Sequence, residues 1–235
     1  MMYDISQESN LLDCIERKAS PGKISSFWLG MQQYDKIWDL QKELHKNIVD
    51  QKMGDVLLLL EHPHVYTLGK NADSNHLLPS YPKDADVINI DRGGDITYHG
   101  PGQLVGYPII NLKRYKKSVS WYMHSLEAMI IKTLDEIGIS SSRRDGLTGV
   151  WVEDDKICAF GVRMAKWTTM HGFALNFNPD MKFFNGIIPC GIFEYGVISI
   201  HELLDVKFSI KELANKVSTN CNEYFRNNIL EQDFA

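Results

Sequence analysis

The chain has 235 residues, of which 44% are hydrophobic, 11% aromatic and 23% charged. This composition is typical of a folded globular protein of one or two domains and argues against disorder, collagen-like repeats and coiled coil. The 25 basic and 30 acidic residues give a formal net charge of -5. Nucleic acid is therefore not expected as a partner, because proteins that neutralise many phosphates carry excess positive charge.

The apolar stretches and the N-terminus predict a cytoplasmic protein without a membrane span. The longest uninterrupted apolar run is Val56–Leu60, whereas a spanning helix needs about 18 apolar residues. Residues 1–20 contain no basic stretch followed by an apolar one, and their acidic residues are untypical of a transit peptide. The cysteines at positions 14, 158, 190 and 221 include no Cys-x-x-Cys pair, so we expect reduced thiols rather than disulfides or a zinc site.

The first half of the chain is predicted to hold one helix followed by several strands. Apolar residues recur at helical spacing between Trp28 and Ile48, which predicts an amphipathic helix over about 26–52. The nearly continuous apolar run at 55–61 is typical of a strand buried on both faces. Further strands are predicted at 65–69, 87–90 and 103–110.

The second half is predicted to contain two helices and a hairpin. A helix is expected over 120–137, capped by Ser118 or Ser120 and ended by Gly138. Strands at 148–152 and 156–164 should form a hairpin, with a strand at 173–177 nearby. Ser209 and Glu212 have the spacing of a capping box, which predicts a closing helix. This order favours an α/β or α+β fold with a mixed sheet.

The segment RGGDITYHGPGQ at 92–103 is the most unusual in the chain, with four glycines in twelve residues. Glycines permit positive φ and lack a Cβ, so peptide N–H groups can approach an anionic or carbonyl oxygen of a ligand. Arg92, Thr97, His99 and Gln103 add side-chain donors. A glycine-rich hairpin is the simpler alternative. The pattern is neither GxGxxG nor a P-loop, so nucleotide binding has no direct support.

Cys190 and Lys156 are candidate catalytic residues. Cys190 stands between a proline and a glycine, which suits a nucleophile on a loop, although a small buried apolar residue is the simpler interpretation. A catalytic thiol needs a cation or base nearby, because the thiolate is the reactive form. Lys156 begins an apolar strand and, with period 2, should share a side with Cys158 and Phe160. It is either a solvated hairpin lysine or an ammonium that faces a pocket.

Histidines give no prediction of a metal centre. His62 and His64 are separated by a proline and have no third ligand at diagnostic spacing. His171 begins another predicted strand and is either a pocket donor or a hydrogen-bonded edge residue. We therefore predict no metal.

Several blocks occur together in the order found in one family. The chain resembles the lipoyl(octanoyl) transferase family over residues 26–215. The resemblance implies the fold of biotin and lipoate protein ligases, a mixed β-sheet flanked by helices, in a single catalytic domain over 26–235. Residues 1–25 are then an N-terminal arm of unassigned role. The blocks are EHPHVYTLGK at 61–70, RGGDITYHGPGQ at 92–103, TGVWV at 148–152, KICAFGVRM at 156–164, HGFALN at 171–176 and GIIPCGI at 186–192.

The resemblance also implies site residues. By position, the acyl-accepting cysteine of the family falls on Cys190, and the lysine thought to lower its pKa falls on Lys156. His64 stands where a proline is more usual, and the segment 193–200 follows the family only loosely. The implied substrate-lining residues are Arg92, Gly93, Gly94, Asp95, Ile96, Thr97, Tyr98, His99, Ala159, Phe160, Gly161, Gly172, Phe173 and Ala174. The acyl tail requires an apolar tunnel, and we expect Tyr98, Phe160 or Phe173 to line it.

The implied reaction moves an octanoyl group from octanoyl-acyl carrier protein to a specific lysine of a lipoyl domain, in 2-oxoacid dehydrogenases or the glycine cleavage H protein. It proceeds through a thioester on the cysteine and needs no ATP or other cofactor, because thioester to amide is downhill. Three alternatives remain open at this point: an ATP-dependent lipoate-protein ligase, an amidotransferase that moves octanoate between lipoyl domains, and a carrier-binding module without turnover.

Overall fold

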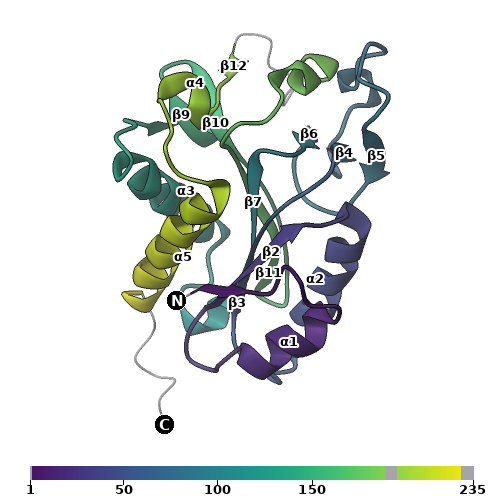
Figure 1. The fold of residues 1–235 in the computed structure, drawn as a ribbon. Helices are drawn as coiled ribbons and strands as arrows, with labels where there is room; N and C mark the ends of the chain where they lie inside the picture. The colour runs from purple at the N-terminus through teal and green to yellow at the C-terminus, as the bar shows by residue number, and fades with distance from the viewer. Residues whose placement is uncertain (1, 189–194, 229–235) are drawn as a thin grey trace.

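Two β-sheets form the framework of the computed structural model, which describes residues 2–188 and 195–228 (Figure 1). The larger sheet has the strand order β1-β2-β3-β7-β11-β10-β9-β8, with β12 paired to β10, and the smaller has the order β5-β4-β6. The strands are β1 Met2–Asp4, β2 Ser25–Met31, β3 Val56–Glu61, β4 Val65–Leu68, β5 Asp86–Asn89, β6 Ile96–His99, β7 Gln103–Ile109, β8 Ser142–Arg144, β9 Leu147–Val152, β10 Asp155–Ala165, β11 Thr168–Asn176 and β12 Gly196–Val197.

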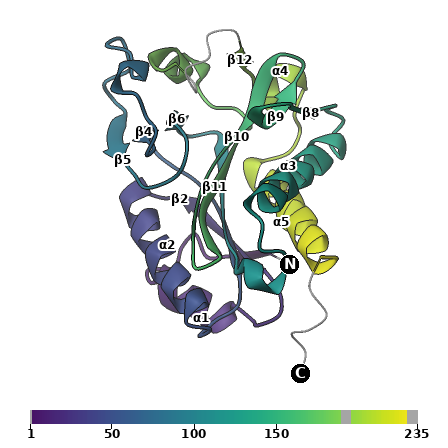
Figure 2. The ribbon, with the colours of Figure 1, turned by 180° about the vertical axis from the view of Figure 1, so that it is seen from behind.

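Helices cover both faces of the larger sheet (Figures 1 and 2). Side chains of α1 and α2 pack on one face and those of α3 and α5 on the other. The α-helices are α1 Leu11–Lys18, α2 Tyr34–Val49, α3 Val119–Asp135, α4 Ile200–Leu203 and α5 Ile210–Arg226, and the 3₁₀ helices are η1 Ser74–His76, η2 Leu112–Arg114 and η3 Met181–Gly186.

The centre of the sheet explains the apolar run at 55–61. Leu57 and Leu59 of β3 pack under α3 and α5, whereas Val56 and Leu58 pack under α1 and α2. Successive side chains of a strand point to opposite faces, so a strand covered on both faces is apolar at every position. β1, β2 and β3 run parallel to one another, whereas the pairs β3–β7, β7–β11 and β11–β10 are antiparallel. The predicted mixed sheet flanked by helices is confirmed.

The start of the helix predicted over 26–52 is wrong. Residues 25–31 form β2, which lies between β1 and β3, and α2 begins only at Tyr34. Phe27 and Leu29 contact the α1 and α2 layer while Trp28 contacts the opposite layer, which is the alternation of a strand. The apolar residues of β2 and of α2 happen to follow one another at roughly helical spacing, and the sequence pattern therefore suggested a single helix.

The N-terminal segment packs as part of the fold. β1 pairs in parallel with β2, with Met2 opposite Ser26. Cys14 and Ile15 of α1 are buried against the sheet. No functional role for this segment follows from its packing.

The predicted helix ends agree with the structure. The Ser118 side chain accepts a hydrogen bond from the Trp121 N–H at 3.2 Å and caps α3, and Gly138 follows that helix with a φ of 87°. Ser209 and Glu212 form the predicted capping box of α5. These are local interactions, which is why the sequence predicts them well.

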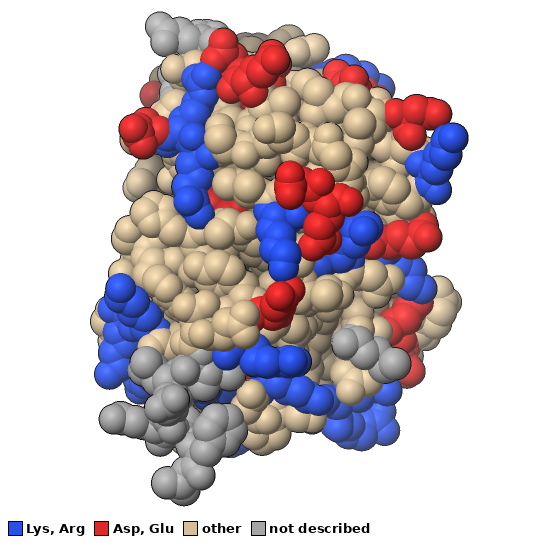
Figure 3. Space-filling model, turned by 90° about the vertical axis from the view of Figure 1, so that its left-hand side faces the viewer, with Lys and Arg blue, Asp and Glu red and all other residues tan. Residues whose placement is uncertain are grey.

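Charges of both signs are interspersed on the side of the molecule that carries α3 and α5 (Figure 3). Lys132 pairs with Glu223 at 2.7 Å there, which links the two helices. Within the described ranges, no helix is long and apolar enough to cross a membrane.

Candidate active site

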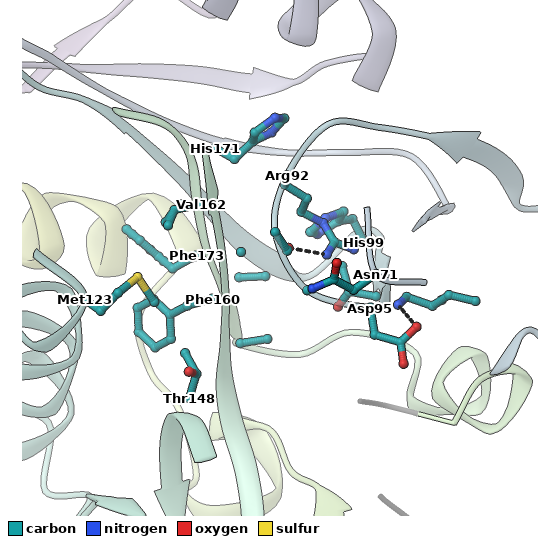
Figure 4. Close-up of a pocket in the computed structure, with 18 of the residues that line it drawn as sticks. Asn71, Arg92, Asp95, His99, Met123, Thr148, Phe160, Val162, His171 and Phe173 are labelled. Carbon is teal, nitrogen blue, oxygen red and sulfur yellow. Dashed lines mark hydrogen bonds between the residues drawn. The ribbon is translucent and has the colours of Figure 1, made fainter. Parts of the chain in front are cut away.

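A cavity of about 570 Å³ is lined by residues on both sides of the β10–β11 hairpin: Figure 4 shows Met123, Phe160 and Phe173 on one side, and Arg92, Asp95 and His99 of the glycine-rich segment on the other. Its wall combines small residues of the two strands with apolar side chains and several buried polar groups. The lining residues are Tyr34, Asn71, Arg92–Thr97, His99, Tyr107, Met123, Gly146–Thr148, Lys156, Ala159–Val162 and His171–Ala174.

The cavity has an open end and a buried end. Asn71, Gly94 and Thr148 are exposed and form its mouth, whereas Tyr107 and His171 are 3% and 1% exposed. In Figure 4, Thr148 and His171 lie at opposite ends of the residues drawn. A ligand that enters the mouth therefore extends toward His171.

The structure brings the three predicted substrate-lining segments to one cavity. All their residues line it except Tyr98. The Tyr98 hydroxyl lies 2.7 Å from His64 Nδ1, and its ring stacks on Phe183 at 5.0 Å. Side chains alternate along β6, so Tyr98 points away from the side that carries Thr97 and His99. The expectation that Tyr98 lines an acyl tunnel is wrong for this reason.

Lys156 lies at the mouth. Its Nζ is 4.7 Å from the centroid of the Trp151 ring, a cation–π contact with the neighbouring strand. The pairing of β10 with β9 shifts register between Lys156, opposite Trp151, and Cys158, opposite Val150. This bulge breaks the alternation that was expected to place Lys156 and Cys158 on one side. Cys158 is fully buried in the core, and burial raises the pKa of its thiol.

Cys190 lies outside the described residues, but the described segments on either side of it are anchored near the cavity. The Ile188 N–H donates to the His76 carbonyl at 2.9 Å. Beyond the gap, Gly196 and Val197 pair with Asp155 and Lys156. The chain thus resumes beside the strand that carries Lys156.

The glycine-rich segment is held between β4 and β10 by Arg92. The buried guanidinium donates to the Thr67 carbonyl at 2.7 Å and to the Gly93 carbonyl at 3.1 Å. The Gly93 N–H donates to the Val162 carbonyl at 3.0 Å. A Cβ at Gly161 would lie 2.8 Å from Arg92 Cδ, so a glycine is needed where this segment crosses β10.

Asp95 connects the mouth to η1. Its carboxylate lies 2.5 Å from His76 Nδ1 and also accepts from the Asp73 N–H at 3.3 Å. The carbonyl of the same His76 holds Ile188. His76 therefore contacts both Asp95 of the cavity wall, through its ring, and Ile188 of the segment that leads to Cys190, through its carbonyl.

The buried end contains two hydrogen-bonded chains. In one, His62 lies between the Gln32 carbonyl at 2.7 Å and the Tyr107 hydroxyl at 2.8 Å, and the Tyr34 ring packs beside the His62 ring with centroids 5.0 Å apart. Burial lowers the pKa of His62 to about 4, so the ring is neutral near pH 7. His62 is thus engaged in this chain, and across the described residues no cluster of three His, Cys, Asp or Glu side chains could hold a metal.

In the other chain, His99 Nδ1 lies 2.8 Å from Gln103 Oε1, and the Gln103 amide donates to Asn176 at 2.9 Å. Asn176 in turn donates to the Ile198 carbonyl at 3.1 Å. Burial lowers the pKa of His99 to about 3. Its neutral ring stacks on Tyr34 with centroids 5.9 Å apart.

His171 occupies the innermost position of the cavity. Its Nε2 lies 2.9 Å from Asp91, which also pairs with Arg163 at 2.8 Å. Its backbone has a φ of 57°, and its N–H donates to Gln41 at 2.8 Å. His171 therefore lines the cavity while its ring is hydrogen-bonded to Asp91, and it does not stand at a sheet edge, because β11 lies between β7 and β10.

Sequence reasoning missed Tyr34, Tyr107 and Met123, which also line the cavity. Tyr34 and Met123 were assigned to the apolar faces of helices and Tyr107 to a strand, and such residues look the same in sequence as core residues. Only the packing of α2, α3 and β7 around the hairpin distinguishes them.

Comparisons with known proteins agree with this architecture. The lipoyl protein ligase A/B catalytic domain model matches residues 33–222. An octanoyltransferase of Flavobacterium johnsoniae is 44% identical over 223 residues, 86% of this chain and 96% of that protein. An octanoyltransferase of Cytophaga hutchinsonii is 43% identical over 210 residues, 80% of this chain and 86% of that one.

A solved structure of P. falciparum LipL1 in complex with lipoate superposes with a TM-score of 0.68 at 16% identity, covering 90% of this chain and 65% of that one. This second likeness concerns the fold alone. The lipoate ligase fold that the resemblance implied is confirmed.

Proposed function

The chain belongs to the lipoyl protein ligase A/B catalytic domain family and is an acyltransferase that moves octanoyl groups in protein lipoylation, and we propose that it does so through a thioester on Cys190. The proposed donor is octanoyl-acyl carrier protein. The proposed acceptor is a specific lysine of a lipoyl domain, in 2-oxoacid dehydrogenases or the glycine cleavage H protein. The cytoplasm is the proposed compartment.

The observation that carries this proposal is the cavity with Lys156 at its mouth. Its lining includes Met123, Phe160 and Phe173, which lie together on one side of β10–β11 (Figure 4) and are apolar, as an acyl chain requires. Before Cys190, the chain is held by the hydrogen bond from Ile188 to the His76 carbonyl. After it, Val197 pairs with Lys156.

In the first half-reaction, the Cys190 thiolate attacks the carbonyl carbon of the donor thioester. A new C–S bond forms on Cys190, the C–S bond to the carrier breaks, and the carrier leaves as a thiol after taking up a proton. The Lys156 ammonium would favour the thiolate by its charge. Peptide N–H groups near Gly161 or in the glycine-rich segment are candidates to hold the tetrahedral oxyanion.

In the second half-reaction, the neutral amine of the acceptor lysine attacks the acyl-enzyme carbonyl. A C–N bond forms, the C–S bond to Cys190 breaks, and the amine proton passes to the thiolate or to Lys156 in its neutral form. The product is an octanoyl amide. No nucleotide takes part, because the acyl group enters already activated as a thioester.

Intact-mass measurement tests the proposal. Incubation with octanoyl-carrier protein and no nucleotide should add one octanoyl group to the protein, and a lipoyl domain should then receive it. Cys190→Ser should abolish the adduct. Cys158→Ser is the matched control, because Cys158 is buried in the core, and it should keep both steps.

Three outcomes would contradict the proposal. Transfer by Cys190→Ser at the wild-type rate would exclude a thioester on Cys190 as the intermediate. Transfer that requires free octanoate and ATP would instead indicate a ligase that adenylates the acid. Octanoyl-lipoyl domain as the preferred donor would indicate the amidotransferase.

A further inference from the structure

Glu127 is a buried carboxylate beside the mouth of the cavity, and the proposed reaction gives it no role. It lies on α3 and is 4% exposed. Met123, one helical turn earlier on the same face of α3, lines the cavity. Burying a charge is costly unless the charge is paired and hydrogen-bonded, so the groups that hold this carboxylate indicate what it does.

The two oxygens of this carboxylate have different partners. Oε2 pairs with Nε of Arg143 at 2.9 Å, and Oε1 accepts from the Gly149 N–H at 3.3 Å. Strand pairing is irregular on both sides of β9, which shifts register against β8 and against β10. Such a shift takes peptide groups out of the regular ladder, and Glu127 supplies the acceptor for the N–H of Gly149.

Gly149 lies directly against the side chain of Lys156. Its φ is 150°, and a Cβ built on it would lie 3.1 Å from Lys156 Cε and 3.0 Å from Trp151 Nε1. Lys156 Nζ in turn is 4.7 Å from the centroid of the Trp151 ring. Both Gly149 and Trp151 belong to β9, so a shift of this strand would move the surroundings of the lysine side chain.

The charges of Glu127 and Lys156 both act on the buried thiol of Cys158. Burial raises the pKa of this thiol, and as smaller effects the Lys156 ammonium lowers the pKa and the Glu127 carboxylate raises it. A direct effect of Glu127 on any nearby thiolate is therefore unfavourable, because like charges repel. An effect that Glu127 exerts by placing Lys156 has the opposite sign, and the two can be told apart by experiment.

We propose that Glu127 is a positioning residue for the acylation of Cys190: its carboxylate holds the Gly149 peptide against Lys156 and so keeps the ammonium at the mouth. This role rests on the proposed function, in which that ammonium favours the Cys190 thiolate. The constraint passes through β9, while Arg143 pairs with the second oxygen of the carboxylate.

A double-mutant cycle of Glu127→Gln and Lys156→Met tests this role. Glutamine has one acceptor oxygen, so it cannot serve both Arg143 and Gly149. A displacement of about 1 Å in an active site can cost about 10²-fold in rate, and Glu127→Gln should slow single-turnover formation of the octanoyl adduct by about tenfold. In the Lys156→Met background the same change should have an effect of less than about twofold, because the group that Glu127 positions is absent.

The pH dependence of Cys190 alkylation by iodoacetamide, followed by peptide mass, is the second measurement. Cys14, Cys158 and Cys221 are buried. Because the thiolate is the reactive form, loss of a well-placed ammonium moves the profile to higher pH. Glu127→Gln should therefore shift the profile to higher pH, as Lys156→Met does. A carboxylate that acts on the thiol by its own charge would give a shift to lower pH when removed.

Gly149→Ala is a second variant, which leaves the Glu127 carboxylate in place. Its Cβ would crowd Lys156 Cε, so it should slow adduct formation and shift the alkylation profile in the same direction as Glu127→Gln. Glu136→Gln is the matched control, because Glu136 is an exposed glutamate at the end of the same helix. It should change neither measurement.

Additive effects in the cycle, an adduct rate of Glu127→Gln equal to that of the wild type, or an alkylation profile that does not move to higher pH would overturn the inference. If the wild type forms no octanoyl adduct but the alkylation profile of Glu127→Gln moves with that of Lys156→Met, the thioester mechanism fails while the positioning role stands. If Cys190 is acylated and the effects add, only the positioning role fails.

Discussion

At the scale of single residues, Lys156 has two separable roles in the proposed reaction. Arginine keeps a positive charge but does not give up its proton. Lys156→Arg should therefore form the acyl-enzyme within about tenfold of the wild-type rate, and lose roughly 10²–10⁴-fold in transfer to the amine, the usual range for a positioned acid or base. Lys156→Met should slow both steps. Single-turnover mass measurements of each half-reaction distinguish these outcomes.

The matched control is Lys166→Met, which removes an exposed lysine from the turn after β10 and should change neither step. Acylation of Lys156→Met at the wild-type rate would show that the charge of this lysine does not activate the thiol. The cation–π contact with Trp151 keeps the ammonium at the mouth, and arginine can make a similar contact.

At the scale of elements, Asp55 fastens η2 to the start of β3. Its carboxylate is 1% exposed and meets Arg114 at 3.0 Å and the Asn111 N–H at 2.9 Å. Burial raises the pKa of this carboxyl, while Arg114 favours its charged form. Asp55→Ala leaves a partly buried guanidinium without its partner, which should lower the free energy of unfolding by about 3–5 kcal/mol.

Urea denaturation provides the measurement, with Asp39→Ala as control. Asp39 pairs with Lys42 at 2.8 Å, but its side chain is 76% exposed, and such a surface pair contributes about 0–1 kcal/mol. Equal losses in the two variants would contradict a buried, structurally important ion pair at Asp55.

The elements also show where sequence reasoning works. Strands were predicted at 103–110, 148–152 and 156–164, close to β7, β9 and β10, because each has its own pattern and turn residues, and α3 and α5 were predicted because their caps are local. β2 was missed because its strand character depends on parallel neighbours, β1 and β3, that are distant from it in the chain: Met2 pairs with Ser26, and Ser25 with Val56. A periodicity measured along one segment does not report such pairing.

At the scale of the whole molecule, the site is assembled from segments that the sequence keeps apart. The glycine-rich segment, β10 and β11 could be named as lining only through the family resemblance, since spacing alone does not bring them together. Tyr34 from α2 and Tyr107 from β7 complete the inner end, and no local signal marks them. Folding also brings together the two hydrogen-bonded chains that contain His62 and His99, whose ring centroids are 5.9 Å apart.

The two buried histidines, His62 and His99, make the stability of the molecule depend on pH. His62 and His99 are neutral in the fold, because burial lowers the pKa of His62 to about 4 and that of His99 to about 3. In the unfolded chain both titrate near 6.5. Between these values the unfolded state binds more protons than the folded state, so stability is full above pH 6.5 and is lost as the pH falls.

The expected loss is about 2 kcal/mol per ring between pH 7 and pH 5, since each ring approaches 1.36 kcal/mol per pH unit. Urea titrations at pH 7, 6 and 5 measure it. His62→Gln should reduce the slope by about one ring's share, because Gln does not titrate in this range. Tyr122→Phe lowers stability without removing a titrating group and should keep the wild-type slope. A free energy of unfolding that stays level down to pH 5 would mean that the two rings do not remain neutral and buried in the folded state.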